Sequence, residues 1–119
     1  MVNVNENNAY KRGQELLDSG MYKEAIEQFD AAIREQPDSW KAINSKGFAF
    51  QKMSKYTEAV ECFDKALQIN PKSVDALLNK GVAYEQKGNY KKAKSIYLQI
   101  LKDNPNYQLA IDALHRMGE

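Results

Sequence analysis

A spacing of 34 residues recurs throughout this 119-residue sequence. The residues that keep the interval most strictly are Gly13, Gly47 and Gly81; Ala25, Ala59 and Ala93; and Pro37, Pro71 and Pro105. A fixed period between about 20 and 50 residues is typical of proteins built from stacked structural repeats. Each unit of such a protein is too small to bury its own apolar face, so the units are stable only as an array.

Each unit is predicted to contain two helices. In the second half of the middle unit, apolar side chains fall at the three- and four-residue intervals of an amphipathic helix. These side chains are Tyr56, Ala59, Val60, Phe63, Ala66 and Leu67. The first half shows the same spacing from Ala42 to Met53, and Ser39 stands before it as an N-terminal cap. Proline disfavours helical backbone in the residue before it, so Pro71 and its equivalents separate one unit from the next.

The same pattern predicts seven helices, near residues 6–19, 22–35, 39–53, 56–69, 73–87, 90–103 and 107–117. We expect Asn5 to cap the first helix and Asn89 the sixth, whereas Met21 and Lys55 are poor caps. The connections are short, so consecutive helices should be antiparallel neighbours. The last helix has no partner and carries His115 where earlier units have glycine, so we interpret it as a terminal cap.

The three periodic glycines indicate close packing between paired helices. A glycine inside a helix costs about 1 kcal/mol relative to alanine, so three equivalent glycines need a packing reason. We expect them to meet the small side chains of Ala25, Ala59 and Ala93 on the second helix of each unit.

The combined pattern resembles the tetratricopeptide-repeat family. The middle unit matches the family's motif through Ile43, Gly47, Phe50, Ala59, Phe63, Ala66 and Pro71. The first unit matches through Ala9, Gly13, Leu16, Ala25, Phe29, Ala32 and Pro37, and the third through Leu77, Gly81, Tyr84, Ala93, Tyr97, Ile100 and Pro105. The resemblance implies an all-α, right-handed superhelical array of antiparallel helix pairs. It would form a single domain over residues 1–119, with repeats at about 6–39, 40–73 and 74–107 and a capping helix at about 108–118.

The resemblance also implies a function. Members of the family hold a peptide segment of a partner protein in a concave groove lined by the first helix of each unit, in a scaffold or adaptor role. The candidate partner-binding residues are Tyr10, Gln14, Leu17, Lys41, Asn44, Ser45, Phe48, Gln51, Lys52, Leu78, Asn79, Val82 and Glu85. The apolar ones among them either form a strip in the groove or pack between adjacent first helices.

One subset of the family clamps the C-terminal carboxylates of heat-shock chaperones with two lysines, two asparagines and an arginine. The matching positions here hold Tyr10, Gln14, Ser45, Asp75 and Asn79, none of which is the required residue. We therefore expect that this protein is not such a carboxylate clamp.

Charge is distributed unevenly along the chain, although the net charge is only +1. Residues 6–39 carry four basic and eight acidic side chains, whereas 40–73 and 74–107 each carry six basic and three acidic ones. This uneven distribution of charge leaves self-assembly into a homo-oligomer as an alternative function.

The small net charge and the scarcity of free aromatic side chains near the lysines argue against a nucleic-acid partner. No long apolar run or secretory signal is visible, so we expect no membrane partner and a cytoplasmic protein.

Catalytic and metal-binding chemistry is not expected. The single histidine, His115, excludes a metal site built on several histidines, and the sequence contains no phosphate-binding loop or nucleophile-elbow motif. Cys62 and His115 lie in different units and make an improbable catalytic dyad. The sequence therefore predicts a binding protein without a cofactor rather than an enzyme.

Overall fold

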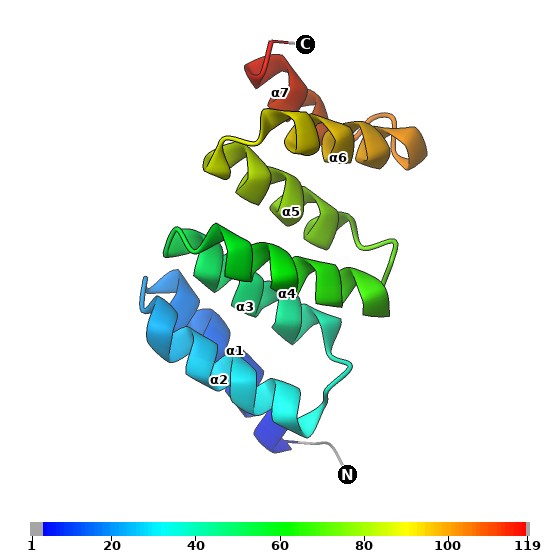
Figure 1. The fold of residues 1–119 in the computed structure, drawn as a ribbon. Helices are drawn as coiled ribbons and strands as arrows, with labels where there is room; N and C mark the ends of the chain where they lie inside the picture. The colour runs from blue at the N-terminus through cyan, green and yellow to red at the C-terminus, as the bar shows by residue number, and fades with distance from the viewer. Residues whose placement is uncertain (1–3, 119) are drawn as a thin grey trace.

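The computed structural model describes residues 4–118, with side chains from residue 8 onward, and this range contains seven α-helices and no strand. The helices are α1 (Val4–Asp18), α2 (Tyr22–Glu35), α3 (Trp40–Lys52), α4 (Tyr56–Ile69), α5 (Val74–Lys87), α6 (Tyr90–Asp103) and α7 (Gln108–Arg116). Figure 1 shows them stacked in chain order from the N-terminus to α7. The all-α prediction is confirmed.

Helix ends agree closely with the sequence pattern. The helices α2, α4 and α6 span the predicted ranges, and α3 and α5 each begin one residue later than predicted. Helix α1 begins at Val4, so Asn5 lies within the helix rather than before it. The expected capping contact of the Asn5 side chain lies outside the described residues.

Side-chain caps follow the residue chemistry. Ser39 and Asn89 accept hydrogen bonds from the backbone N–H three residues later, at 3.4 and 3.3 Å, as predicted. Ser73 makes the equivalent bond at 3.2 Å at the start of α5. Met21 and Lys55 make no capping bond, because neither side chain has an acceptor oxygen.

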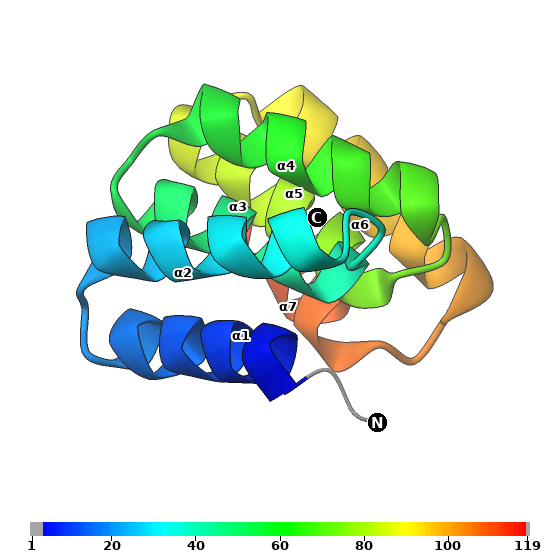
Figure 2. The same ribbon diagram turned by 90° about the horizontal axis from the view of Figure 1, so that it is seen from below.

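The first helices of the pairs come together on one side of the array. Helix α1 contacts α3, and α3 contacts α5, in addition to the contacts within each pair and between successive helices. Seen from below in Figure 2, the elements wind around an axis, with α1 and α7 on the same side of the molecule. The described chain extends over 47 × 28 × 20 Å, and α1, α3 and α5 form what we call its inner face.

Each periodic glycine lies against an aromatic ring of the paired helix. The pairs are Gly13 with Phe29, Gly47 with Phe63, and Gly81 with Tyr97. A Cβ atom added at Gly47 would lie 2.6 Å from the Phe63 ring, closer than real Cβ contacts allow. The three rings are fully buried. The glycines therefore let a large ring sit directly on the backbone of the first helix.

The predicted neighbours Ala25, Ala59 and Ala93 are not the residues that lie nearest to the space above each glycine. The closest atoms to an added Cβ belong to the aromatic rings, one turn further along the second helix. The alanines are nevertheless fully buried. The aromatic rings, rather than the alanines, lie nearest to the space that the glycines leave.

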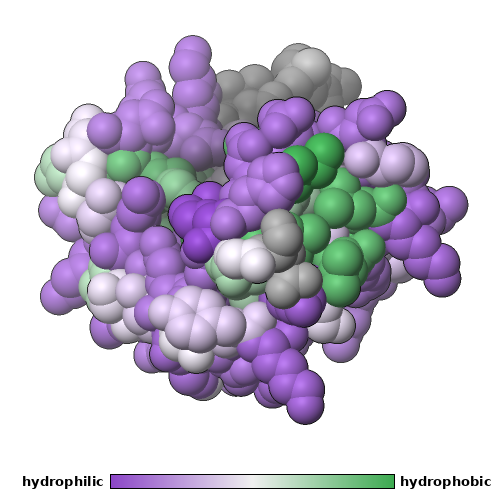
Figure 3. Space-filling model, turned by 90° about the horizontal axis from the view of Figure 1, so that it is seen from above, coloured by the Kyte–Doolittle hydropathy of each residue, from purple (hydrophilic) through white to green (hydrophobic). Residues whose placement is uncertain are grey.

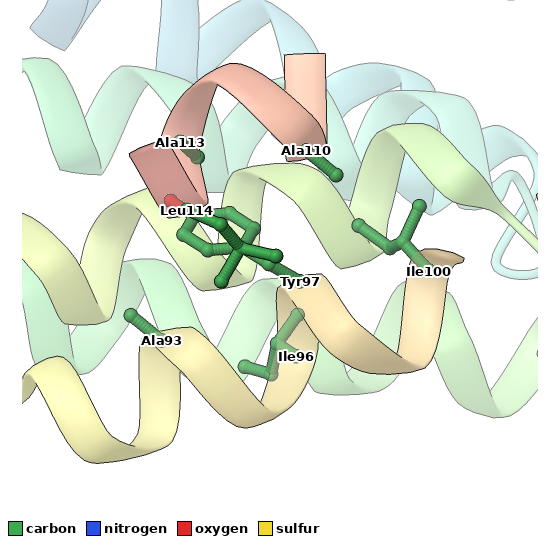
Figure 4. Packing of buried hydrophobic residues seen from close by; sticks show 7 residues of the cluster. All are labelled: Ala93, Ile96, Tyr97, Ile100, Ala110, Ala113 and Leu114. Atoms are coloured by element: carbon green, nitrogen blue, oxygen red, sulfur yellow. The ribbon is translucent and has the colours of Figure 1, made fainter. Parts of the chain in front are cut away.

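Helix α7 packs against the apolar face of α6. Tyr97 and Ile100 of α6 belong to a buried cluster with Ala110, Ala113 and Leu114 of α7, and Figure 4 shows these side chains between the two helices. Tyr97 is completely buried although α6 has no complete helix pair beyond it. Helix α7 therefore covers the apolar side chains of α6 around Tyr97 and Ile100.

Ion pairs connect successive units along the array. Lys46 Nζ lies 2.7 Å from Asp30 Oδ1, and Lys80 Nζ lies 2.7 Å from Asp64 Oδ1, one repeat further on. The next positions in this register are Leu98 and Leu114. The junction between α6 and α7 is therefore apolar where the earlier junctions are charged, and Leu98 remains half exposed. Figure 3 shows hydrophobic groups gathered on one side of this end of the molecule.

We expect Gly47→Ala to destabilise the protein, although alanine is the better helix former. The new methyl group would overlap the Phe63 ring and lie 2.9 Å from Cβ of Cys62. Overpacking of a core typically costs about 1–3 kcal/mol, which outweighs the gain of about 1 kcal/mol in helix propensity. Urea unfolding of the variant and the wild type measures the difference.

Ser95→Ala is the matched control, because Ser95 is an exposed position on α6 and gains only helix propensity. A Gly47→Ala variant that unfolds at higher urea concentration than the wild type would contradict the packing argument.

Candidate functional site

The inner face contains every residue predicted to bind a partner. They lie on α1 (Tyr10, Gln14 and Leu17), α3 (Lys41, Asn44, Ser45, Phe48, Gln51 and Lys52) and α5 (Leu78, Asn79, Val82 and Glu85). Their depths differ: the two lysines are exposed, Gln51 is buried, and the others are half-buried. The residues therefore lie on the three helices of the inner face but differ in how far a ligand can reach them.

Polar side chains bridge the first two units across the inner face. Gln14 Nε2 donates to Ser45 Oγ at 3.4 Å and to the Tyr10 hydroxyl at 2.7 Å. These bonds link α1 to α3. All three residues are predicted partner contacts, but the bonds that Gln14 makes to the other two were not predicted.

Two amide bridges connect α3 to α5. Asn79 Nδ2 donates to Asn44 Oδ1 at 3.2 Å, and Gln51 Nε2 donates to Gln86 Oε1 at 3.0 Å. Gln51 is only 6% exposed, and its side-chain oxygen is enclosed without a hydrogen-bond partner. Gln51 thus contributes to the helix interface, whereas the half-buried Asn44 and Asn79 reach the surface.

A charged bridge connects α5 to α7. Arg116 donates from Nε and Nη2 to the two carboxylate oxygens of Glu85, at 3.0 and 2.9 Å. The Tyr97 hydroxyl also donates to Glu85, at 2.8 Å. The hydrogen bonds from Arg116 lower the pKa of Glu85, and burial together with the Glu85 carboxylate raises the pKa of Tyr97.

The sequence did not reveal Arg116 as a contributor to the inner face. Arg116 and Glu85 are 31 residues apart, as are the hydrogen-bonded Gln14 and Ser45. This shared separation is the feature of the sequence that could have indicated the bridge. The bridge also extends the inner face beyond the third pair to α7.

The apolar residues of the inner face fall into two groups. Tyr10 packs against a buried alanine cluster, and its ring centroid lies 5.9 Å from that of Phe29. Leu78 and Val82 pack against the cluster between α6 and α7. Among the described residues, no buried cluster includes Phe48, and Lys52 Nζ lies 5.2 Å from its ring centroid. Phe48 is therefore the aromatic side chain of this face that contributes least to the buried clusters.

A separate cavity of about 770 Å³ lies on the other side, between α2 and α4 and over α3. It contains none of the predicted partner-binding residues, and Cys62 is part of its lining. Burial raises the pKa of Cys62 to about 11, so the side chain is a thiol at neutral pH and a poor nucleophile.

No group of three or more potential metal ligands occurs among the described residues. Within the same range, no helix combines the length and apolarity needed to cross a membrane.

Two sequence models of one family, the tetratricopeptide repeat, match the chain, over residues 51–117 and 10–50. No curated protein matches its sequence. The similar solved structures include the first tetratricopeptide-repeat domain of Spaghetti (RPAP3) bound to the HSP90 peptide SRMEEVD. That likeness has a TM-score of 0.88 at 20% identity and covers 98% of this chain and 92% of the other.

Two further solved structures show the same fold. The second such domain of human RPAP3, in complex with the HSP70 peptide SGPTIEEVD, has a TM-score of 0.88 at 22% identity and covers 98% of this chain and 97% of the other. The Arabidopsis OM64 domain has a TM-score of 0.87 at 22% identity, with coverages of 93% and 92%. At these identities the likeness is one of fold.

We expect Arg116→Gln to lower the free energy of unfolding by about 1 kcal/mol at neutral pH, since exposed Arg116 loses a charge-assisted pair of hydrogen bonds. The pKa of Glu85 lies below its ordinary value of 4.5, so the carboxylate stabilises the fold above pH 4.5. This stabilisation is lost as the pH falls through the lowered pKa. Urea unfolding from neutral to about pH 3 should show the wild type and variant converging.

Lys102→Gln removes one positive charge from an exposed position of α6 that forms no ion pair among the described residues, so it controls for net charge. A difference between Arg116→Gln and wild type that stays constant with pH would contradict the role assigned to Glu85.

Proposed function

This chain belongs to the tetratricopeptide-repeat family, and from that premise we propose that it is a scaffold or adaptor that binds a peptide segment of a partner protein on its inner face. The family is in general one of protein-interaction modules rather than enzymes. We take residues 6–39, 40–73 and 74–107 as the three repeats and α7 as the cap.

The observation that carries the proposal is the continuous inner face of α1, α3 and α5, with polar bridges between neighbouring helices. The bridges hold the helices at fixed separations, while Asn44, Asn79 and Phe48 remain partly accessible. A rigid surface with a few accessible polar groups beside apolar ones is typical of ligand sites. The contacts that anchor the peptide would come from the middle of this face.

We propose further that the ligand is not the acidic tail of a heat-shock chaperone. Of the five positions that match the family's carboxylate clamp, Gln14 donates hydrogen bonds to two others, Tyr10 and Ser45. Asp75 is exposed and would repel a carboxylate. Asn79 carries no charge. None of these side chains supplies the positive charge that a C-terminal carboxylate and acidic side chains need.

We expect no saturable binding of the peptide SRMEEVD at concentrations up to roughly 1 mM, a limit that corresponds to about −4 kcal/mol. The reason is the missing positive charge and the repulsion from Asp75. Isothermal titration calorimetry measures it, with the first repeat domain of Spaghetti, which is bound to this peptide in its structure, as the positive control. A micromolar dissociation constant for this chain would contradict the proposal.

We expect Phe48→Glu to abolish the binding of peptides selected on the wild-type protein from a random displayed library. The substitution puts a negative charge in the middle of the inner face, at a side chain that belongs to no buried cluster, so the fold should persist. Fluorescence polarisation of the selected peptides measures the change in affinity.

Ser95→Glu is the matched control, because it introduces the same charge at an exposed position of α6 outside the inner face. Selected peptides that bind Phe48→Glu as tightly as the wild type, or that are lost in Ser95→Glu instead, would place the binding site elsewhere.

A further inference from the structure

The turns within the three helix pairs lie along one edge of the molecule. They are residues 19–21 between α1 and α2, 53–55 between α3 and α4, and 88–89 between α5 and α6. Figures 1 and 2 show all three on the same side, with the α3–α4 turn between the other two. The turns that join successive repeats lie on the opposite side. We call the first set of turns, together with the helix ends beside them, the turn edge.

The charge of the turn edge reverses from one end to the other. Around the α1–α2 turn, residues 15–30 contain five acidic side chains and one basic side chain, Lys23. Around the α5–α6 turn, residues 86–102 contain five lysines and no acidic side chain. One end of the edge is therefore acidic and the other is basic.

The charged side chains beside these two turns are accessible. Asp18 and Glu24 flank the α1–α2 turn, Lys91 and Lys92 follow the α5–α6 turn, and all four are exposed. In the part of the chain that the structure describes, none of the four forms an ion pair. Each end of the edge therefore presents charges that another molecule can neutralise.

Each end of the turn edge also exposes one large apolar side chain. Met21 in the α1–α2 turn is 44% exposed, and Tyr90 at the start of α6 is 61% exposed. Tyr22 and Tyr56 occupy the register of Tyr90 in the earlier repeats, and both are half-buried. A methionine sulfur makes favourable contacts with an aromatic ring. The two ends of the edge are therefore complementary in their apolar side chains as well as in charge.

We infer that two copies of this chain pair through their turn edges in antiparallel orientation and form a symmetric dimer. In such a two-fold arrangement, the α1–α2 turn of each copy faces the α5–α6 turn of the other. The acidic end of one edge then meets the basic end of the second, and Met21 contacts Tyr90 of the other copy. A parallel orientation brings like charges together and is disfavoured for that reason.

The middle of the turn edge fits the same arrangement. The α3–α4 turn lies near the two-fold axis and faces its own copy, so its side chains must be self-complementary. This turn carries exposed Lys55, and exposed Glu58 follows it in the first turn of α4. Lys55 of each copy pairs with Glu58 of the other. The dimer does not rest on the proposed peptide binding, which is assigned to the inner face.

Sedimentation equilibrium of the wild-type chain at about 20 mM and about 500 mM NaCl tests the dimer, because salt screens exposed charges. At low salt we expect the average mass to approach twice that of one chain as the protein concentration rises toward roughly 1 mM. At high salt we expect the mass of one chain. A monomer at low salt over the whole concentration range would overturn the inference.

Two charge-reversed double variants locate the contact. Asp18→Lys/Glu24→Lys places basic side chains at both ends of the edge, and Lys91→Glu/Lys92→Glu places acidic ones at both. Each variant alone should self-associate about tenfold more weakly than wild type or worse, because like charges now meet. An equimolar mixture should recover the wild-type affinity, since every acidic end again meets a basic one. Native mass spectrometry identifies the mixed dimer, and a mixture that stays monomeric would refute the pairing.

Lys72→Glu/Lys102→Glu is the matched control for Lys91→Glu/Lys92→Glu. It makes the same change in net charge at two exposed lysines outside the turn edge, in the α4–α5 turn and the last turn of α6. We expect its self-association to stay within about threefold of wild type, because exposed charges far from the contact are screened. An equal loss in both variants would show that net charge alone governs association, against the inferred contact.

Discussion

The close contact between a glycine and an aromatic ring sets the geometry of every helix pair. With no side chain at Gly47, the ring of Phe63 lies against the backbone of α3, and the same arrangement recurs one repeat before and after. Because the helix pairs share one geometry, side chains 34 residues apart have similar neighbours. The ion pair between Asp30 and Lys46 therefore reappears between Asp64 and Lys80. The packing within one helix pair thus also determines the interface that each repeat makes with the next.

The glycine–ring geometry is not encoded in α7. His115 occupies the glycine register of α7, and a side chain there leaves no room for a ring packed directly on the backbone. Leu98 and Leu114 occupy the positions of the recurrent ion pair, so no ion pair can form there. The bond of Arg116 to Glu85 ties α7 to α5 on the inner side. Helix α7 is therefore held by contacts that differ in kind from those between the repeats.

The sequence predicted the helices well because their apolar side chains recur with a strict period. It also identified Ser39 and Asn89 as caps, since capping depends on local chemistry alone. It did not identify the residue that meets each glycine. Periodicity shows that two positions recur together, but both Ala59 and Phe63 recur with Gly47, and only the rotation of α4 against α3 decides between them.

The sequence indicated which helices form the inner face, but it did not indicate which of their side chains are buried in helix interfaces and which remain accessible. Asn44 and Gln51 look alike in sequence, as uncharged amides on the same side of α3. They differ because Gln51 lies deep in the α3–α5 interface, whereas Asn44 stands at its edge. The bond to Asn79 also fixes Asn44 before any ligand arrives. A side chain that is already ordered by such a bond loses little conformational entropy on contact with a ligand, which is the physical benefit of a polar bridge at the edge of an interface.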